Sequence, residues 1–328
     1  MVNNNSYACP VCRAPLEGSG TILSCGSCRK EYPIDGGIPL LFYQPEGTGS
    51  GTGVTTKVKS FYEETPFPDY DGFETLADLV QRAQRSVFAR LLNEQLPFNV
   101  HILEAGCGTG QLSNYLGSAQ RFVTGTDMSL NSLRLAQAFK DKHDLNRVRF
   151  CQMNLFHPVF PEESFFAVIS NGVLHHTADP YRGFRTLARL VQRGGYIIIG
   201  LYNTYGRLTT DIRRVLFRMS NGLRFLDPHL RRKDIGGTKK NAWFQDQYMN
   251  PHESKHTFDE ALMWFHETGF EFMNSIPAMK PGVPFSEREQ LFTSHDPGTH
   301  LERLGAQLSM IPSGSREGGF FIMIGRRI

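Results

Sequence analysis

The chain has 328 residues, of which 40% are hydrophobic and 20% charged, and its formal net charge is +3. This length exceeds one average domain, and the composition is that of an ordinary globular protein that is soluble in water. The longest apolar runs, such as 196–201 and 320–324, have the length of strands and are too short to cross a bilayer. The polar segment 1–8 carries no secretory pattern, so the sequence predicts a cytoplasmic protein without a membrane span.

The cysteines are concentrated near the N-terminus. Four of the six form two C-x-x-C pairs, Cys9–Cys12 and Cys25–Cys28. In a cytosolic protein such pairs indicate a metal site before they indicate disulfides. Each pair can bring two thiolates to one tetrahedral Zn²⁺, and four cysteine ligands leave no open position on the metal. We therefore expect a structural zinc ion, without which a unit of about forty residues has too small a core to fold.

The segment after the second pair reads Tyr32-Pro-Ile-Asp-Gly-Gly-Ile-Pro-Leu-Leu41. Together with the Cys-Pro-x-Cys start, it resembles the small zinc-ribbon activator proteins that partner tRNA, rRNA and protein methyltransferases. The resemblance covers nearly all of residues 7–43 and implies a module fused to its methyltransferase. Such a module could stabilise the enzyme, dock a substrate, or do no more than fold. No obligate separate protein partner is predicted.

The next residues suggest how the chain is divided. Residues 44–56, QPEGTGSGTGVTT, are mainly Gly, Ser and Thr, which predicts a flexible linker. We expect a zinc ribbon over 1–43, this linker, and a catalytic domain over 57–328. Apolar residues at helical spacing predict a helix over 73–96.

Strands and helices alternate from residue 100 onward. Strands are expected at 101–104, 122–126, 148–152, 165–170, 196–201, 270–273 and 319–325, and helices at 111–116, 130–140, 181–191 and 258–267. This rhythm predicts an α/β fold with a mostly parallel, seven-stranded, Rossmann-like sheet that helices cover on both faces. Two long insertions, about 203–257 and 274–317, interrupt this alternation of strands and helices. We expect them to form a lid over a substrate pocket at the C-terminal ends of the strands.

The segment Leu103-Glu104-Ala105-Gly106-Cys107-Gly108-Thr109-Gly110 follows the first strand of this sheet. Its glycines, Gly106, Gly108 and Gly110, let the backbone approach a ligand, and the N-terminus of the next helix is electropositive. The dinucleotide fingerprint needs a glycine where this chain has Gln111. Glu104 would repel a pyrophosphate but attract the amino group and the sulfonium of S-adenosylmethionine. The segment therefore favours S-adenosylmethionine over NAD.

Further cofactor residues are expected at the ends of the neighbouring strands. Asp127 could accept hydrogen bonds from ribose hydroxyls, or it could cap the following helix, a position that Ser129 could fill instead. Asn154 could bind the adenine amine. We assign Met128, Leu155 and Asn171 to the same site.

Residues 100–202 resemble the core of class I methyltransferases, especially the type 11 branch, which includes C-methyltransferases of quinone biosynthesis. The resemblance rests on LEAGCGTG, GTDMS, SFFAVISNGVLHHTADP and the Arg193-Gly-Gly-Tyr196 turn. Two positions depart from the branch, Asn154 and Phe166, where Asp is usual. The resemblance implies the cofactor and the reaction class but not the acceptor.

Methyl transfer to oxygen or carbon needs a base, whereas an amine only has to arrive deprotonated. The candidate catalytic residues are His175 and His176 at the end of the fourth strand, and His256 as a substrate-side residue. The stretch from Arg207 to Lys240 carries ten Lys or Arg and three Asp, a local charge of +7. This charge could recognise RNA, a phosphorylated or carboxylated small molecule, or an anionic lipid face, or it could belong to a solvated surface.

Three functions remain open on these grounds. The first is methyl transfer to a small molecule or biosynthetic intermediate, possibly an anionic one. The second is an RNA methyltransferase that uses the zinc ribbon and the basic insertion. The third is a scaffold that binds the cofactor but does not catalyse.

Overall fold

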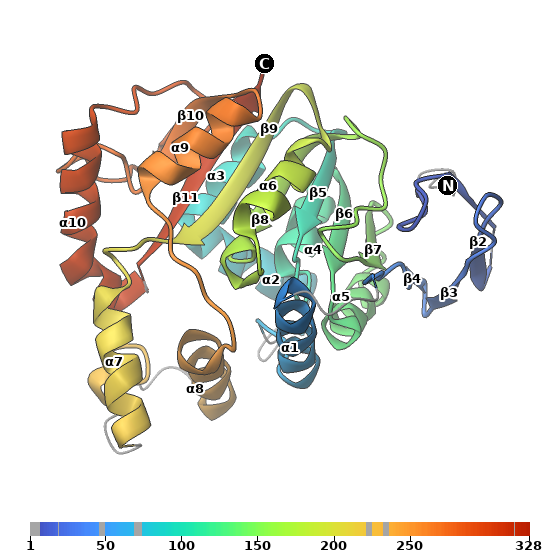
Figure 1. Ribbon diagram of the computed structural model, residues 1–328, viewed down its shortest axis with the longest axis horizontal. Helices are drawn as coiled ribbons and strands as arrows, with labels where there is room; N and C mark the ends of the chain where they lie inside the picture. The colour runs from blue at the N-terminus through green and yellow to red at the C-terminus, as the bar shows by residue number, and fades with distance from the viewer. Residues whose placement is uncertain are drawn as a thin grey trace.

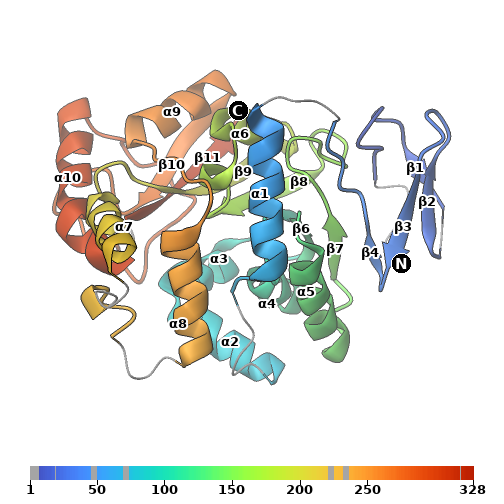
Figure 2. The same cartoon turned by 60° about the horizontal axis from the view of Figure 1, so that its bottom comes forward.

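The structure, a computed structural model, describes residues 7–18, 20–45, 50–68, 74–220, 225–231, 236–317 and 319–328. These residues form a small antiparallel ribbon near the N-terminus and a larger α/β unit beside it (Figures 1 and 2). The ribbon has four short strands in sequential order, β1 (Leu16–Glu17), β2 (Ile22–Cys25), β3 (Glu31–Asp35) and β4 (Ile38–Pro39).

The α/β unit is built on one sheet in the order β10-β11-β9-β8-β5-β6-β7. Its strands are β5 (His101–Ala105), β6 (Phe122–Asp127), β7 (Val148–Gln152), β8 (Phe165–Asn171), β9 (Val191–Tyr202), β10 (Phe270–Ile276) and β11 (Phe320–Arg327). Strands β5 to β9 are parallel, and β11 is antiparallel to both of its neighbours. The predicted seven-stranded, mostly parallel sheet is confirmed. The chain reverses its direction of winding between β5 and β8, which places a ligand-binding crevice at their carboxyl ends.

The helices of the described residues are α1 (Ser50–Glu64), α2 (Leu76–Arg85), α3 (Val87–Gln95), α4 (Gln111–Ser118), α5 (Leu130–Lys142), α6 (Pro180–Ala188), α7 (Leu208–Met219), α8 (Gly237–Phe244), α9 (Phe258–Glu267) and α10 (His300–Glu317), with a 3₁₀ turn η2 (Leu174–His176) and a π turn η4 (Gln245–Met249). Within the part of the chain that the structure describes, no helix has both the length and the apolar character needed to cross a bilayer.

Two hydrophobic layers hold helices such as α3, α6 and α9 on opposite faces of the sheet. Leu103 of β5 packs in one layer with Phe184 of α6 and Phe265 of α9. Its neighbour Ile102 packs in the other layer with Leu92 of α3. Because successive side chains of a strand point to opposite faces, strands buried on both sides read as continuous apolar runs.

The helix predicted over 73–96 consists of two helices, α2 and α3, which are separated at Ser86; Phe73 lies outside the described residues. The backbone of Ser86 is extended, with φ −83° and ψ 109°, and its hydroxyl accepts a hydrogen bond from the N–H of Ala89. Ser86 therefore caps α3. Apolar periodicity does not reveal this break, because the spacing continues across it.

Residues 50–56, which were expected to belong to a flexible linker, instead form the beginning of α1, and the expected boundary at residue 57 falls inside this helix. Residues 46–49 lie outside the described part. Since Gly, Ser and Thr favour helices weakly, tertiary contacts have to stabilise α1. Val58 is buried, the Gln44 amide donates to the Thr52 carbonyl at 3.0 Å, and the helix packs beside α5 (Figures 1 and 2).

The ribbon binds the β7 edge of the large sheet. Leu40 forms a parallel bridge with Gln152, and the N–H of Leu41 donates to the Gln152 carbonyl at 3.0 Å. Arg13 Nη2 donates to the Phe160 carbonyl at 2.9 Å. The ribbon thereby pairs backbone groups at an edge that would otherwise leave them open.

The two insertions differ in their position relative to the cavity described below. The first, 203–257, contains α7, α8 and η4 and contributes to the cavity described below. The second, 274–317, does not form part of a lid as expected, because none of its described residues lines that cavity. The loop that contains Leu291 packs on α3. Leu291 is completely buried there, and the N–H of Leu291 donates to Gln95 Oε1 at 2.8 Å.

Glu63 joins α1 to the beginning of α5. Its carboxylate accepts hydrogen bonds from the N–H groups of Leu130 and Asn131, both at 3.0 Å, and Lys59 lies 2.7 Å away. Helix N-termini have unsatisfied N–H groups and a positive dipole, so a carboxylate is favourable there. Burial acts to raise the pKa of Glu63, but Lys59 and these N–H groups hold that pKa below its ordinary value.

Replacing Glu63 by Ala should therefore lower the free energy of unfolding by about 1–2 kcal/mol. The exposed Glu64, whose side chain forms no hydrogen bond or ion pair with the described residues, provides a matched control. Glu64→Ala should change the stability by less than about 0.5 kcal/mol. Urea unfolding followed by circular dichroism measures both effects, and equal losses would contradict the capping role of Glu63.

Candidate functional site

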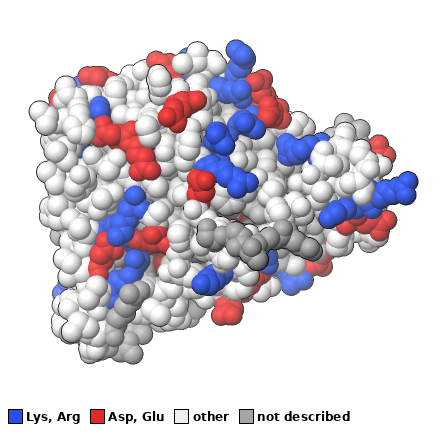
Figure 3. Space-filling model, viewed as in Figure 1, with Lys and Arg blue, Asp and Glu red and all other residues white. Residues whose placement is uncertain are grey.

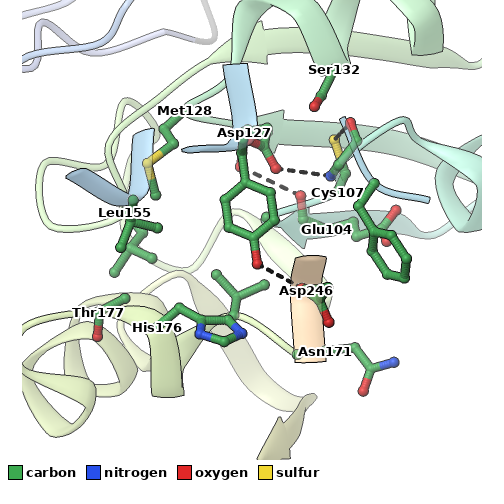
Figure 4. Close-up of a pocket in the computed structure, with 18 of the residues that line it drawn as sticks. Glu104, Cys107, Asp127, Met128, Ser132, Leu155, Asn171, His176, Thr177 and Asp246 are labelled. Atoms are coloured by element: carbon green, nitrogen blue, oxygen red, sulfur yellow. Dashed lines mark hydrogen bonds between the residues drawn. The ribbon is translucent and has the colours of Figure 1, made fainter. Parts of the chain in front are cut away.

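A cavity of about 620 Å³ opens at the C-terminal ends of β5, β6 and β8 (Figure 4). This volume is typical of sites for small organic ligands. Eight of the nine predicted cofactor residues line it, namely Glu104, Gly106, Gly108, Asp127, Met128, Asn154, Leu155 and Asn171. The opposite wall comes from α1 and η4, so segments that are far apart in the sequence enclose one space.

The glycines after β5 have different roles. Gly106 and Gly108 have positive φ angles, +77° and +52°. A Cβ on Gly106 would lie 2.3 Å from Val173 Cγ2, and one on Gly108 would lie 2.2 Å from the Phe67 carbonyl oxygen. Both positions therefore require glycine. Gly110 lies outside the cavity lining; it begins α4 where a Cβ would meet side chains of α5 and β7.

Glu104 is the second-last residue of β5, and its side chain lines the cavity. The side chain is 8% exposed, and Ser113 Oγ donates to Oε2 at 2.5 Å. Burial raises the pKa of Glu104 to about 7, an effect that Asp127 adds to and Ser113 opposes. A buried carboxylate of this kind favours a cationic ligand group.

Asp127 connects the end of β6 to the glycine loop. Oδ2 accepts a hydrogen bond from the N–H of Gly108 at 2.8 Å, and Oδ1 accepts one from the N–H of Ser129 at 2.9 Å. Burial raises the pKa of this carboxyl group. Ser129, not Asp127, caps α5, because its hydroxyl accepts from the N–H of Ser132 at 3.1 Å. Each carboxylate oxygen can accept a second hydrogen bond, so Asp127 still offers acceptors to a ligand diol.

Asn154 joins the end of β7 to the segment that leaves the ribbon. Its Nδ2 donates to the Tyr43 carbonyl at 2.9 Å, and its Oδ1 accepts from the N–H of Phe156 at 3.1 Å. The second lone pair of Oδ1 is the acceptor that this side chain can offer an amine. Met128 and Leu155 lie on the same side of the cavity and add apolar surface there (Figure 4).

The residues at the end of β8 and just after it differ in whether they reach the cavity. Asn171 is exposed and lines the cavity, but His175 is fully buried and lies outside the lining. Its ring packs on those of His176 and Tyr202, with both centroid distances 4.2 Å. Burial lowers the pKa of His175 well below its ordinary value. The predicted role of His175 in proton transfer is therefore not supported, because consecutive side chains of the 3₁₀ turn η2 point in different directions.

His176, by contrast, lines the cavity close to Asp246 (Figure 4). Its Nδ1 lies 2.8 Å from the His252 carbonyl oxygen. Because a carbonyl only accepts hydrogen bonds, Nδ1 carries the proton and Nε2 keeps a lone pair. Burial lowers the pKa of His176 below its ordinary value, so the ring is neutral at neutral pH and can accept a proton.

His256 does not reach the cavity. Its Nε2 lies 2.8 Å from Ser254 Oγ, and its Nδ1 lies 2.8 Å from Glu260 Oε1. The residue forms a bridge with Asn203 just before α9 begins. It therefore has structural partners on both ring nitrogens, and the predicted substrate-side role is not supported.

The end of the cavity away from the glycine loop is a network of polar aromatic and amide groups. The Tyr62 hydroxyl donates to Asp246 Oδ1 at 3.0 Å. Gln247 Nε2 donates to Asp246 Oδ2 at 2.9 Å and to the Tyr202 hydroxyl oxygen at 2.7 Å. These side chains offer a small acceptor both donors and acceptors.

None of the Lys and Arg side chains of the first insertion that the structure describes lines the cavity. Arg207 is completely buried, where Nη2 lies 2.6 Å from Glu253 Oε2, and Nη1 donates to Gln247 Oε1 at 2.6 Å. Arg214 pairs with the same carboxylate at 2.9 Å. Burial acts to raise the pKa of Glu253, but the two guanidinium groups hold it at about 2. The side chains of Arg218, Arg224, Arg232, Lys233 and Lys239 lie outside the described residues.

The described lining residues contain three carboxyl groups, Glu104, Asp127 and Asp246, and neither Lys nor Arg. An anion would therefore meet no compensating charge on these walls. The expectation of an anionic acceptor is not supported.

The sequence assigned no site residue to the ribbon, to its linker or to α1, yet Phe42, Thr55, Val58 and Tyr62 of these segments line the cavity. The only sequence signal for them is Val54, Val58 and Phe61 at helical spacing. The surrounding Gly, Ser and Thr favour a linker over a helix, so the spacing alone did not predict α1.

The four predicted metal ligands of the ribbon are brought together. The Sγ atoms of Cys9, Cys12, Cys25 and Cys28 all lie within 4.8 Å of one another. Cys9 and Cys28 are 3.6 Å apart and Cys12 and Cys25 are 3.4 Å apart, which is too far for disulfides. This arrangement suits one tetrahedral ion.

The strand order, the glycine loop and the carboxylates at the ends of β5 and β6 define a class I S-adenosylmethionine-dependent methyltransferase domain. Residues 103–199 match the family model described as "Methyltransferase domain", so the chain contains a domain of this family.

Known proteins are similar in sequence to parts of the chain. It is 26% identical over 197 residues to an uncharacterised protein of Synechococcus sp., covering 52% of this chain and 47% of that one. It is 30% identical over 103 residues to a ubiquinone biosynthesis O-methyltransferase of Coxiella burnetii, covering 31% and 44%. The chain thus spans about half the length of these curated relatives. It is also similar to the crystal structure of magnesium protoporphyrin IX methyltransferase from Synechocystis with bound S-adenosylhomocysteine, with 18% identity, 84% and 100% coverage and a TM-score of 0.49.

Proposed function

We propose that the chain transfers a methyl group from S-adenosylmethionine to a small, uncharged molecule. One observation carries this proposal: a single cavity places two carboxylates beside a glycine loop at one end and a neutral histidine beside Asp246 at the other. The first group suits the cofactor and the second suits an acceptor.

The residues present fit the cofactor. Glu104 would hold its amino group and sulfonium, Asp127 its ribose, and Asn154 with Leu155 its adenine, while the glycines leave room for its backbone contacts. When bound, S-adenosylmethionine supplies a methyl group that its sulfonium has already activated. The protein has to orient the acceptor toward that methyl group and exclude water.

The acceptor end favours a hydroxyl compound without negative charge. Its walls carry Tyr62, Tyr202 and Asp246 but no described Lys or Arg. His176 Nε2 would take the proton from the hydroxyl as the oxygen–methyl bond forms, and the pair of electrons in the carbon–sulfur bond would leave with the sulfur. The likeness to a ubiquinone biosynthesis O-methyltransferase supports an oxygen acceptor. An RNA acceptor has less support, because Arg207 and Arg214 form internal ion pairs.

We further infer that the ribbon holds one structural zinc ion. Four thiol sulfurs within reach of one ion support a closed Cys₄ site. Its function is to fold the ribbon, whose core is small. Metal analysis of the purified protein checks this inference directly, and protein that folds without any zinc would contradict it.

The cofactor site can be tested by calorimetric titration with S-adenosylmethionine. Because burial raises the pKa of Glu104 to about 7 and the cation prefers the ionised form, the affinity should rise between about pH 6 and pH 7 and then level off. Glu104→Gln should weaken binding about tenfold and remove this pH dependence. Glu64→Gln is the control and should bind like the wild type. Folded wild-type protein that does not bind at any pH would overturn the cofactor assignment.

The role of His176 can be tested by transfer of a labelled methyl group to a panel of phenols and aliphatic alcohols. His176→Gln retains a donor for the His252 carbonyl but lacks the base, so the transfer rate should fall about 10²–10⁴-fold with unchanged cofactor affinity. In the wild type the rate should fall only at a pH below the ordinary pKa of histidine, because burial lowers the pKa of His176. Equal rates in wild type and variant would refute the role of His176. Cofactor binding without transfer to any compound of the panel or of a cell extract would favour the scaffold hypothesis.

A further inference from the structure

Trp243 contributes the indole ring of its side chain to the wall of the cavity. It belongs to α8, which continues into η4, and Asp246 and Gln247 follow it by three and four residues. Side chains at this spacing share one face of a helix, and all three line the cavity. The indole therefore belongs to the same wall as the polar network of Tyr62, Asp246 and Gln247 at the acceptor end.

A buried carboxylate holds one edge of this indole. Asp227 is 2% exposed, and its Oδ2 accepts hydrogen bonds from Trp243 Nε1 at 3.1 Å and from the Tyr248 hydroxyl at 2.6 Å. Its Oδ1 accepts from the N–H of His229 at 2.6 Å. Since a buried charge is stable only when it is well bonded, these donors keep Asp227 in one position. Tyr248 is itself anchored, because it is buried and packs with Phe217.

An imidazole ring covers one face of the indole. The rings of His229 and Trp243 are stacked, with centroids 4.2 Å apart and an angle of 25° between their planes. With this face covered and the N–H edge bonded, the opposite face and the C–H edges of Trp243 remain for the cavity that it lines. The indole is thus fixed at an edge and on a face, and it presents a flat apolar surface of defined orientation.

We propose that Trp243 is a specificity-determining residue that selects a planar, aromatic hydroxyl compound as the acceptor, and that Asp227 and His229 are positioning residues for its ring. Aromatic rings prefer offset-stacked or edge-to-face contacts with one another, and such contacts add to the effect of burying their area. A saturated ring is puckered and touches a flat indole with fewer atoms at contact distance. This inference names the acceptor class of the proposed active site and therefore rests on the proposed function.

The chemistry of the acceptor end favours the same class. The base proposed there is the neutral ring of His176, and the described lining residues include no Lys or Arg that could stabilise an alkoxide. A phenolic hydroxyl, with a pKa of about 10 as in tyrosine, gives up its proton to such a base more readily than an aliphatic hydroxyl does. On the face seen in Figure 3, basic and acidic side chains are intermixed beside α7, so this surface has no single sign of charge that would favour an anionic acceptor.

Calorimetric titration with 2-naphthol and with decahydro-2-naphthol tests this selection, because the two compounds share a carbon skeleton and a hydroxyl but only the first is flat. The wild type should bind 2-naphthol about fivefold more tightly, both alone and with S-adenosylhomocysteine bound. Trp243→Leu should abolish this preference, whereas Trp243→Phe keeps a flat ring and should retain most of it. Equal affinities of the wild type for the two compounds, or an unchanged preference in Trp243→Leu, would overturn the proposal.

The role of Asp227 can be read from the fluorescence of Trp243. The chain has two tryptophans, and Trp264 is buried on α9 outside the cavity lining, so Trp264→Phe leaves Trp243 as the only indole. This variant is the matched control and should bind 2-naphthol like the wild type. In its background Asp227→Leu should lower both the anisotropy of the Trp243 emission and the preference for 2-naphthol, and Asp227→Asn, which keeps one acceptor oxygen, should restore part of both. Unchanged anisotropy and preference in Asp227→Leu would refute the positioning role.

Failure of the proposed function gives a different result. Protein that does not bind S-adenosylhomocysteine would contradict the cofactor assignment, while the preference of the cofactor-free protein for 2-naphthol, and its loss in Trp243→Leu, would still decide the role of Trp243. Conversely, normal affinity for S-adenosylhomocysteine together with equal binding of the two naphthols would leave the methyltransferase assignment intact and overturn only the acceptor class.

Discussion

Backbone pairing between the ribbon and the edge strand β7 is the contact on which the cofactor cavity depends. Leu40 and Leu41 add to the sheet beside Gln152 and fix the point at which the chain leaves the ribbon. The next residues are then placed at the cavity, since Phe42 lines it and the Tyr43 carbonyl accepts from Asn154. From there the chain continues into α1, which covers α5 and supplies Tyr62. The N-terminal segment is therefore part of the site and not an appendage.

The distribution of charge divides the cavity into two functional ends. Two carboxyl groups, Glu104 and Asp127, lie close together near the glycine loop, and burial raises the pKa of both. Placing two such groups together costs free energy, which a cationic ligand offsets. At the other end, the buried guanidinium of Arg207 is compensated by Glu253 and stays behind Tyr202 and Gln247. An acceptor bound there, as proposed, would meet hydroxyl, amide, imidazole and carboxyl groups, and no positive charge from the described lining residues.

The sequence predicted the central sheet well, because strands buried on both faces are continuous apolar runs with glycines and polar residues at their ends. It also located Glu104, Asp127 and the four cysteines, whose spacing reflects local geometry. It could not distinguish His175 from His176, because one residue of a 3₁₀ turn decides which ring faces the cavity. It missed Tyr62, since α1 is stabilised by contacts with α5 and not by helix propensity. Nor could it show that Arg207 is paired internally, because Glu253 lies forty-six residues further along the chain.

The dependence of the cofactor site on the ribbon can be tested most directly by measuring the affinity for S-adenosylhomocysteine before and after a chelator removes the proposed zinc. Loss of the metal should unfold the ribbon and release Phe42 and Tyr43, while circular dichroism should still show the α/β unit. The affinity should then fall by about tenfold, and adding zinc back should restore it. An unchanged affinity in zinc-free protein would show that the cofactor site forms without the ribbon and would contradict this account.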